Sequence, residues 1–329
     1  MTRLRLGTRG SRLAVTQSEQ VAQRLRDRSP DLSVELVEIR TSGDVIRDVP
    51  LGPHLGRSFF TKEIEVALLE GRIDVAVHSC KDLATAMTPG LLLAAVPVRE
   101  DARDALVSAA GRLSELPAGA RVGTSSPRRK GFLAVARPDI HVQDQRGNVP
   151  TRLRAVEVGS VDAVILALAG LRRLGLSDRV VETLDPSVML PAAGQGALAV
   201  QVRADDVPTR NAVGWLDDPE SRARVSAERA CLHALEAGCH APVGALARVD
   251  RQRLHLSAAV VTPDGVVRAE EAGSLADVGS SAERLRTAEA VGVAAARSLL
   301  AKLGLSSLAA TPWAGPAPER VARPGVERP

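Results

Sequence analysis

The chain has 329 residues, of which 45% are hydrophobic, and a formal net charge of +4, so it can form two or three domains with apolar cores. Its three cysteines include no C-x-x-C pair, which argues against a disulfide framework and a usual zinc site. No signal-peptide pattern is present, and no apolar run approaches the roughly 18–20 residues that span a bilayer. We therefore expect a cytoplasmic protein that does not enter a membrane.

The first hundred residues alternate strand-like and helix-like segments. The patterns predict strands at 5–8, 34–39, 73–77 and 91–96, and helices at 12–28 and 61–70. Ser11 is placed to cap the first of these helices. This alternation is typical of an α/β unit with a largely parallel sheet and helices on both faces.

A second α/β unit is expected to start near residue 102. Its predicted strands are 122–124, 141–144 and 161–166; Pro127 opens a helix, and the last strand enters a turn at 171–175. A third region follows, with a helix at 219–235, antiparallel strands near 254–259 and 266–272, and a long helix at 282–302. Residues 311–329 are rich in Pro and Arg, and we expect them to be disordered.

Basic side chains follow the predicted strands at the points where those strands end. The arginines concerned are Arg9, Arg128, Arg129, Arg146, Arg152 and Arg173. Guanidinium groups bind carboxylates and phosphates through paired hydrogen bonds, and open α/β sheets bind ligands at the carboxyl ends of their strands. Any one of these arginines could be solvated surface charge, but the whole set indicates an electropositive cleft. Nucleic acid fits this cleft poorly, because aromatic residues make up only 2% of the chain and do not interleave with the cations.

Lys81 and Asp82 directly follow a predicted buried strand and should emerge at the floor of the same cleft. A carboxylate there could stabilise a developing cation and move a proton. A helix N-cap is an equally good interpretation of Asp82 from the sequence alone. Asp44 is a weaker candidate of the same kind.

The cysteines differ in their surroundings. A buried and inert side chain is the default expectation for Cys80 and Cys231. Cys239 follows Gly238 after a helical segment, where exposure and reactivity are more plausible. A zinc site formed by Cys231, His233, Cys239 and His240 is an alternative, but its spacing fits no familiar metal-binding pattern. A thiol that could carry a group covalently, together with many cations, suggests a tethered polyanion.

Seven segments in order resemble the porphobilinogen deaminase (hydroxymethylbilane synthase) family. They are GTRGSRLA (7–14), VAVHSCKDL (75–83), VGTSSPRR (122–129), QRGNVPTRL (145–153), ILALAGLRRLG (165–175), LPAAGQGAL (190–198) and SAERACLHALEAGCHAPVG (226–244). Each motif alone is weak, but seven in register are highly specific.

The resemblance implies a function for individual residues. Cys239 matches the cysteine that holds a dipyrromethane cofactor through a thioether bond, and Asp82 matches the catalytic carboxylate that assists loss of ammonia from each porphobilinogen. Four substrate molecules would be joined head to tail and released as a linear tetrapyrrole. Matching residues place Lys81, Ser126, Arg128 and Arg129 at the cofactor, and Arg9, Ser11, Arg146, Arg152 and Arg173 at the substrate's acetate and propionate groups.

The family also implies the architecture: two α/β domains like those of periplasmic binding proteins flank a cleft, and a small α+β domain carries the cofactor. The boundaries we expect are 1–98 with 195–217, 102–194, and 218–310. A monomer with porphobilinogen as its small-molecule substrate follows from the same resemblance. The alternative from another class is a cytoplasmic polycarboxylate-binding module without chemistry, which needs neither Cys239 nor Asp82.

Overall fold

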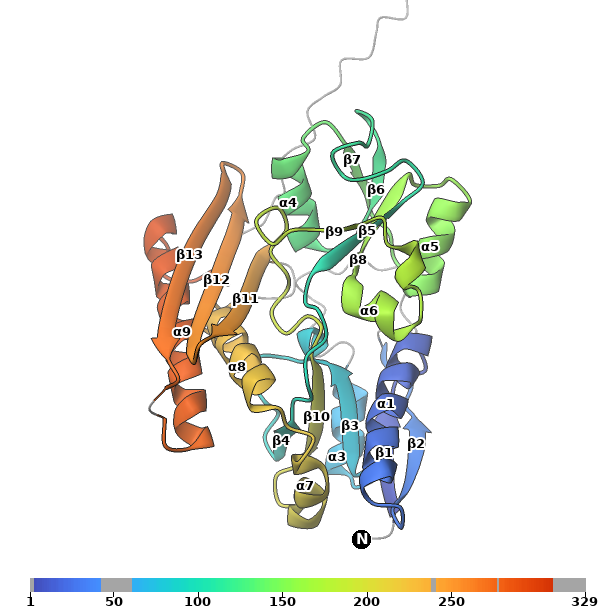
Figure 1. Cartoon of the computed structure of the whole chain (residues 1–329), viewed down its shortest axis with the longest axis vertical. Helices are drawn as coiled ribbons and strands as arrows, with labels where there is room; N and C mark the ends of the chain where they lie inside the picture. The colour runs from blue at the N-terminus through green and yellow to red at the C-terminus, as the bar shows by residue number, and fades with distance from the viewer. Residues whose placement is uncertain (1–2, 43–60, 238–240, 277, 310–329) are drawn as a thin grey trace, which may run out of the picture.

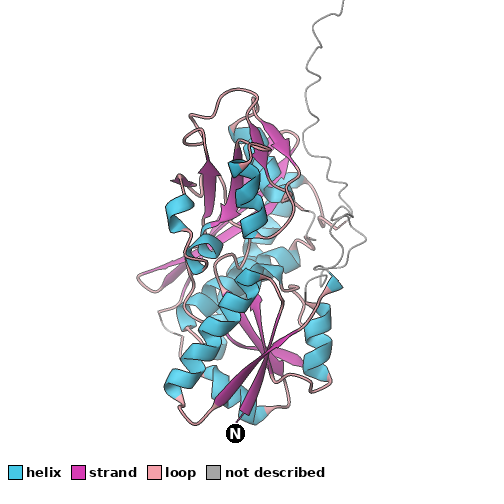
Figure 2. Cartoon of the chain, turned by 90° about the vertical axis from the view of Figure 1, so that its right-hand side faces the viewer, coloured by secondary structure: helices cyan, strands magenta, loops and turns pink. Residues whose placement is uncertain are grey.

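The computed structural model describes residues 3–42, 61–237, 241–276 and 278–309. Three sheets organise it, with the first at the bottom of Figure 1, the second at the top and the third at the left. Helices lie on both sides of the lower sheet in Figure 2. The predicted α/β fold with a smaller α+β unit is thus confirmed.

The first sheet has the strand order β2-β1-β3-β10-β4. Its strands are β1 (Arg3–Thr8), β2 (Ser33–Glu38), β3 (Val75–Ser79), β4 (Leu91–Ala95) and β10 (Leu198–Arg203); its helices are α1 (Arg12–Arg28), α3 (Lys62–Leu69) and α7 (Val207–Gly214). Strand β10 runs antiparallel to both of its neighbours, β3 and β4, whereas β1 is parallel to β2 and β3. Because β1 and β3 are parallel, the residues that follow them emerge at the same edge of the sheet.

The second sheet repeats this design in the order β7-β6-β8-β5-β9, with β5 as its antiparallel strand. Its strands are β5 (Asp104–Ser108), β6 (Arg121–Gly123), β7 (His141–Gln143), β8 (Ala163–Ala167) and β9 (Glu182–Thr183); its helices are α4 (Pro127–Ala136), α5 (Val149–Glu157) and α6 (Leu168–Arg173), with a 3₁₀ turn η2 (Ser177–Arg179). In each sheet the antiparallel strand is the first strand after the chain crosses over from the other sheet: β5 follows β4, and β10 follows β9. Helix α6 includes residues 171–173 of the turn predicted at 171–175, so only the last two residues of that prediction form a turn.

Two crossover segments, residues 96–103 and 190–197, join the two units and lie side by side. The amide of Glu100 donates to the carbonyl of Gly196 over 3.3 Å, and Nε2 of Gln195 donates to the carbonyl of Ala102 over 2.7 Å. Gly196 has φ +87°, and an added Cβ would overlap the carbonyl oxygen of Glu100, so only glycine permits this close approach.

The third sheet is antiparallel, and two helices cover one of its faces. Its strands are β11 (Val243–Asp250), β12 (Arg253–Thr262) and β13 (Gly265–Ser274), and the helices are α8 (Pro219–Ala234) and α9 (Ser281–Leu303). Val261 of β12 shares an apolar core with Phe132 of the second unit, and Val225 of α8 shares one with Cys80 of the first. The third unit is therefore anchored to both others by burial of apolar surface.

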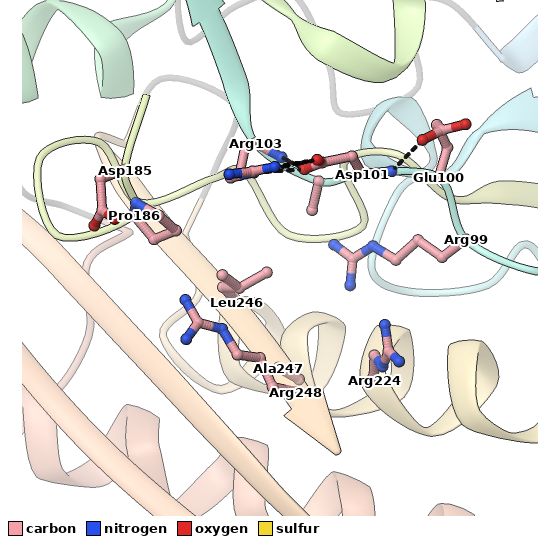
Figure 3. Close-up of a pocket in the computed structure, with 11 residues that line it drawn as sticks. Arg99, Glu100, Asp101, Arg103, Asp185, Pro186, Arg224, Leu246, Ala247 and Arg248 are labelled. Carbon is pink, nitrogen blue, oxygen red and sulfur yellow. Dashed lines mark hydrogen bonds and ion pairs between the residues drawn. The ribbon is translucent and has the colours of Figure 1, made fainter. Parts of the chain in front are cut away.

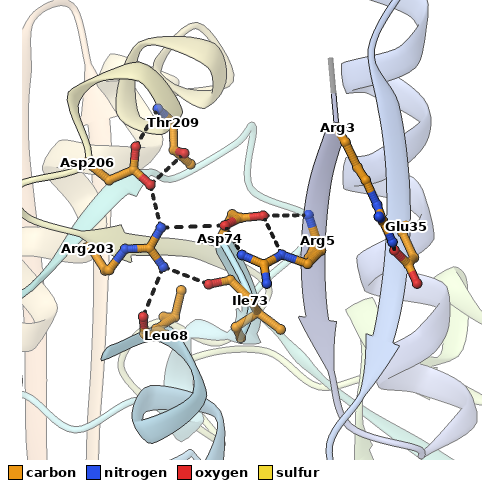
Figure 4. Close-up of polar contacts among 9 residues, drawn as sticks. All are labelled: Arg3, Arg5, Glu35, Leu68, Ile73, Asp74, Arg203, Asp206 and Thr209. Atoms are coloured by element: carbon orange, nitrogen blue, oxygen red, sulfur yellow. Dashed lines mark hydrogen bonds and ion pairs between the residues drawn. The ribbon is translucent and has the colours of Figure 1, made fainter. Parts of the chain in front are cut away.

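A polar network ties the far end of the first sheet together (Figure 4). Asp74 accepts hydrogen bonds from the backbone amide, Nε and Nη2 of Arg5, and Nη2 of Arg203 lies 3.5 Å from its Oδ1. Arg203 also bonds to Asp206 at the start of α7. This network joins β1, β3, β10 and α7 at the amino ends of β1 and β3, away from the edge where Lys81 and Asp82 emerge.

Within the residues that the structure describes, no helix is long and apolar enough to cross a membrane. The expectation for residues 311–329 lies outside those residues. The domain boundaries remain a prediction.

Candidate active site

Lys81 and Asp82 lie in a single 3₁₀ turn, η1 (Cys80–Asp82), directly after β3. The side chain of Cys80 is buried beneath the turn, so the next two residues face away from the core. Ser79 occupies the N-cap position of this turn, and Asp82 is its last residue. The interpretation of Asp82 as a helix N-cap is therefore wrong, and its half-buried carboxylate has no capping role.

Arg128 and Arg129 lie in the first turn of α4, after β6 of the second unit. Pro127 at the helix start fixes the backbone, and Oγ of Ser126 accepts a hydrogen bond from the amide of Arg129 over 3.4 Å. Ser126 thus caps α4, while its hydroxyl hydrogen remains able to donate elsewhere. Both arginine side chains are almost fully buried.

A carboxylate that the sequence analysis missed holds these two arginines. Asp104, the first residue of β5, is fully buried and accepts from Nη1 of Arg128 over 2.7 Å and from Nη2 of Arg129 over 2.7 Å. Nε2 of Gln195 donates to the same group over 3.0 Å. Desolvation alone would raise the pKa of Asp104, but the two guanidinium charges hold it well below its usual range.

Lys81 and Arg152 report the electrostatics of the site. Lys81 is open to solvent, yet desolvation lowers its pKa to about 8; Asp82 opposes that change and Arg129 adds to it. The charged groups that act on Lys81 come from both units, since Asp82 belongs to the first and Arg129 and Asp104 to the second. Desolvation, together with the charges of Arg129 and Arg146, lowers the pKa of Arg152 to about 10, and the charge of Asp82 opposes that change. Cations crowded closely enough to disfavour one another make a strong site for anions.

These couplings bring together most of the predicted site. Lys81 and Asp82 of the first unit interact electrostatically with Arg129 and Arg152 of the second, although β3 and α5 are more than sixty residues apart in sequence. Nε of Arg152 also donates to the carbonyl of Gly147, which fixes the start of α5. The two sheets therefore present their carboxyl edges to one shared, electropositive site.

Other predicted residues lie at the margins of this group. Ser11 caps α1 by accepting from the amide of Ala14, and Arg9 is half-buried near His78, whose pKa it helps to lower. Nη2 of Arg173 donates to the carbonyl of Gly196 over 2.7 Å, which ties it to the second crossover segment.

Two of the three cysteines lie within the described residues, and both are buried as expected. Cys80 and Cys231 are free and buried; burial raises the pKa of Cys80 and raises that of Cys231 to about 12, so both are poor nucleophiles. Cys239 and His240 lie outside the described residues. Among those described, no group of three or more His, Cys, Asp or Glu side chains is arranged to hold a metal ion.

A separate cavity of about 400 Å³ is lined by residues of the first crossover segment and of strand β11 and helix α8 (Figure 3). It is lined by Arg99, Glu100, Asp101, Ala102, Arg103, Asp185, Pro186, Arg224, Leu246, Ala247 and Arg248. None of the predicted site residues lines it. Its charges largely balance, because Arg103 pairs with Asp101, and the buried Arg99 pairs with Glu228 of α8 over 2.6 Å. It therefore lacks the unbalanced positive charge found around Lys81.

Two protein-family models match most of this chain. Residues 4–211 match the family model "Porphobilinogen deaminase, dipyromethane cofactor binding domain", and residues 222–301 match "Porphobilinogen deaminase, C-terminal domain". This chain belongs to the porphobilinogen deaminase family. The resemblance found in its sequence motifs is confirmed, and with it the assignment to a transferase family of tetrapyrrole biosynthesis that uses a dipyrromethane cofactor.

Curated relatives cover nearly the whole chain. The porphobilinogen deaminase of Sorangium cellulosum is 50% identical over 287 residues, which cover 86% of this chain and 96% of that protein. The porphobilinogen deaminase of Syntrophotalea carbinolica is 47% identical over 300 residues, covering 91% and 93%. Among solved structures, the BenM effector-binding domain with its effector benzoate is similar at 16% identity, covering 65% of this chain and 89% of that one, with a TM-score of 0.40.

Hydrogen-bond donors without a partner at the site indicate whether its residues fit the dipyrromethane cofactor of porphobilinogen deaminases. Nε of Arg128 is buried and has no hydrogen-bond partner among the described residues, although Nη1 of the same group is bonded to Asp104. Each pyrrole of dipyrromethane carries two carboxylates, and a guanidinium with a vacant N–H is a natural donor to one of them. The residues present therefore fit the cofactor.

Proposed function

We propose that this chain is a hydroxymethylbilane synthase. It joins four porphobilinogen molecules head to tail on a dipyrromethane primer held by a thioether to Cys239, releases one ammonia per molecule, and then frees the linear tetrapyrrole by hydrolysis. The observation that carries this proposal is the convergence of Asp82 from one unit with the crowded cations Lys81, Arg129 and Arg152 around it.

The cations account for binding. Each added pyrrole brings an acetate and a propionate, so a growing chain needs many positive subsites. Lys81, Ser126, Arg128 and Arg129 are proposed to bind the cofactor's carboxylates. Substrate carboxylates are assigned to Arg9, Ser11, Arg146, Arg152 and Arg173. Bound dipyrromethane supplies the electron-rich pyrrole to which the first substrate is joined.

Asp82 is the proposed catalytic residue. Loss of ammonia leaves positive charge on the substrate's methylene carbon, and a half-buried carboxylate close to that carbon stabilises the charge. The same carboxyl group can pass a proton to the leaving amine and later accept one from the coupled pyrrole. Lys81 lies next to Asp82 on η1 and places a positive charge beside the carboxylate.

The non-catalytic polycarboxylate-binding module is the second candidate. The same arginines would serve it, but it assigns no role to Asp82. We further propose a cytoplasmic monomer that acts on porphobilinogen and binds neither nucleic acid nor membrane. The proposed domains are 1–98 with 195–217, 102–194 and 218–310, which correspond to the three sheets.

Replacing Asp82 by Asn tests the proposed chemistry. The variant keeps the shape of the side chain and should retain the primer, but porphobilinogen consumption should fall by about 100-fold or more. The matched control is Asp144→Asn, which removes an exposed carboxylate that pairs with Lys130 just after β7. Parental turnover in the Asp82 variant would exclude it as the catalytic residue and favour the binding module.

A further inference from the structure

Asp104 forms an unusual junction between the second sheet, helix α4 and both crossover segments. It begins β5 where the first crossover ends, and Gln195 of the second crossover donates to its carboxylate. Nε and Nη2 of Arg129 share Oδ1, while Nη1 of Arg128 reaches Oδ2. An ionised carboxylate without exposure is tolerated only with such complete pairing.

The two arginines are held in different ways. Arg129 uses its Nε, Nη1 and Nη2 for bonds to Asp104 and to the carbonyl of Ile165. Arg128 forms hydrogen bonds only through Nη1, which donates both to Asp104 and to the carbonyl of Leu190, each over 2.7 Å. Its Nε is buried without a partner among the described residues, and its Nη2 makes no hydrogen bond to them.

One edge of Arg128, formed by Nε and Nη2, therefore has no hydrogen-bond partner among the described residues. The Nε–Nη2 edge of a guanidinium presents two parallel N–H donors, the geometry that matches a carboxylate. Anchoring Nη1 at two acceptors stops rotation of the group, so little entropy is lost when that edge is used. One of those two acceptors, Asp104, is itself held by the crossover segments, because it follows the first and accepts a hydrogen bond from Gln195 of the second.

We propose that Asp104 is a positioning residue of this site. By fixing Nη1 of Arg128, it presents the Nε–Nη2 edge to a carboxylate of the bound pyrrole chain, and through Gln195 it couples that orientation to the junction between the two units. The inference rests on the proposed function, because the carboxylate to be bound is that of the primer.

The test compares Asp104→Asn with Asp74→Asn. Asp74 also bridges two arginines, Arg5 and Arg203, but at the opposite end of the first sheet. Each apo-protein is incubated with porphobilinogen, and intact mass gives the fraction that carries a primer of two pyrrole units; kcat and KM are then measured on the loaded fraction. We expect both variants to lose stability, whereas only Asp104→Asn loads slowly and loses roughly ten- to a hundredfold in kcat/KM, mainly through KM.

A second variant covers the case in which Asp104→Asn does not fold. Arg128→Lys keeps the charge and can still reach Asp104, but it lacks the Nε–Nη2 edge, so it should show the same slow loading and raised KM. Parental loading and KM in Arg128→Lys, or equal effects of the two aspartate variants at equal stability, would overturn the proposal. If the parent protein itself never acquires the primer, the proposed function fails instead, and the two failures are distinguishable.

Discussion

His78 should make the folded protein sensitive to acid. Its ring lies in β3 with 5% exposure, and desolvation lowers its pKa to about 4; the hydrogen bond with Gln201 opposes that change and the charge of Arg9 adds to it. Nε2 of Gln201 donates to Glu65, so its Oε1 accepts from the Nε2–H of a neutral His78. Between pH 6.5 and 4 the unfolded chain binds a proton here that the folded chain does not, so stability falls as the pH is lowered.

The size of this effect follows from the two pKa values. With about 6.5 in the unfolded chain and about 4 in the folded one, lowering the pH from 7 to 5 removes roughly 2 kcal/mol of stability, and by pH 4 the loss is roughly 3 kcal/mol. That is a large part of the 5–15 kcal/mol typical of folded proteins.

Urea unfolding between pH 7 and 4.5 measures it for the parent, for His78→Gln and for His255→Gln, whose ring is exposed on β12. Other groups titrate in the same range, so the informative quantity is the difference in slope between variants. The His78 variant should lose less stability on acidification than the parent, and the His255 variant should follow the parent. Parallel curves for the parent and His78→Gln would refute the reasoning.

Two further predictions concern stability. Gly196→Ala places a Cβ against the first crossover segment in a residue with φ +87°, and it should lower the free energy of unfolding in urea by at least about 1–3 kcal/mol. The control is Gly214→Ala, whose Cβ meets nothing within 4 Å and which should change stability by less than about 1 kcal/mol. Equal effects of the two variants would mean that the crossover segments tolerate separation. Asp74→Asn should lower the unfolding free energy by about 1.5–3 kcal/mol, because it weakens hydrogen bonds to charged partners. The control is Glu35→Gln, which removes a charge from an exposed ion pair and should cost under about 1 kcal/mol. An Asp74 variant with unchanged stability would contradict the network of Figure 4.

The sequence was sufficient for elements whose signals are local. Hydrophobic periodicity located α1, α8 and α9, and capping residues such as Ser11 marked where helices begin. The strands of the parallel core were found within a few residues, although β3 runs from Val75 to Ser79 instead of 73–77. The arginines proposed for the site were singled out because they follow strand ends, which needs only the order of elements along the chain; their roles remain a prediction.

Long-range pairing was beyond the sequence patterns. Strand β5 was not predicted, because its short run becomes a strand only by pairing with β8, which lies more than fifty residues later. Asp104 was missed for the same reason: its partners Arg128 and Arg129 are brought to it by the fold. An Asp at the start of an apolar run was the one available signal. Glu228, which is fully buried and paired with Arg99, was equally invisible within a helical segment.

Intact-protein mass spectrometry of freshly purified protein, with Cys239→Ser beside it, tests the central claim most directly. We expect the parent to exceed its polypeptide mass by two pyrrole units and the serine variant to show the bare mass. If the parent is bare when purified, incubation with porphobilinogen should add the same mass. A parent that stays bare after that incubation would contradict the account and favour a polycarboxylate-binding protein without chemistry.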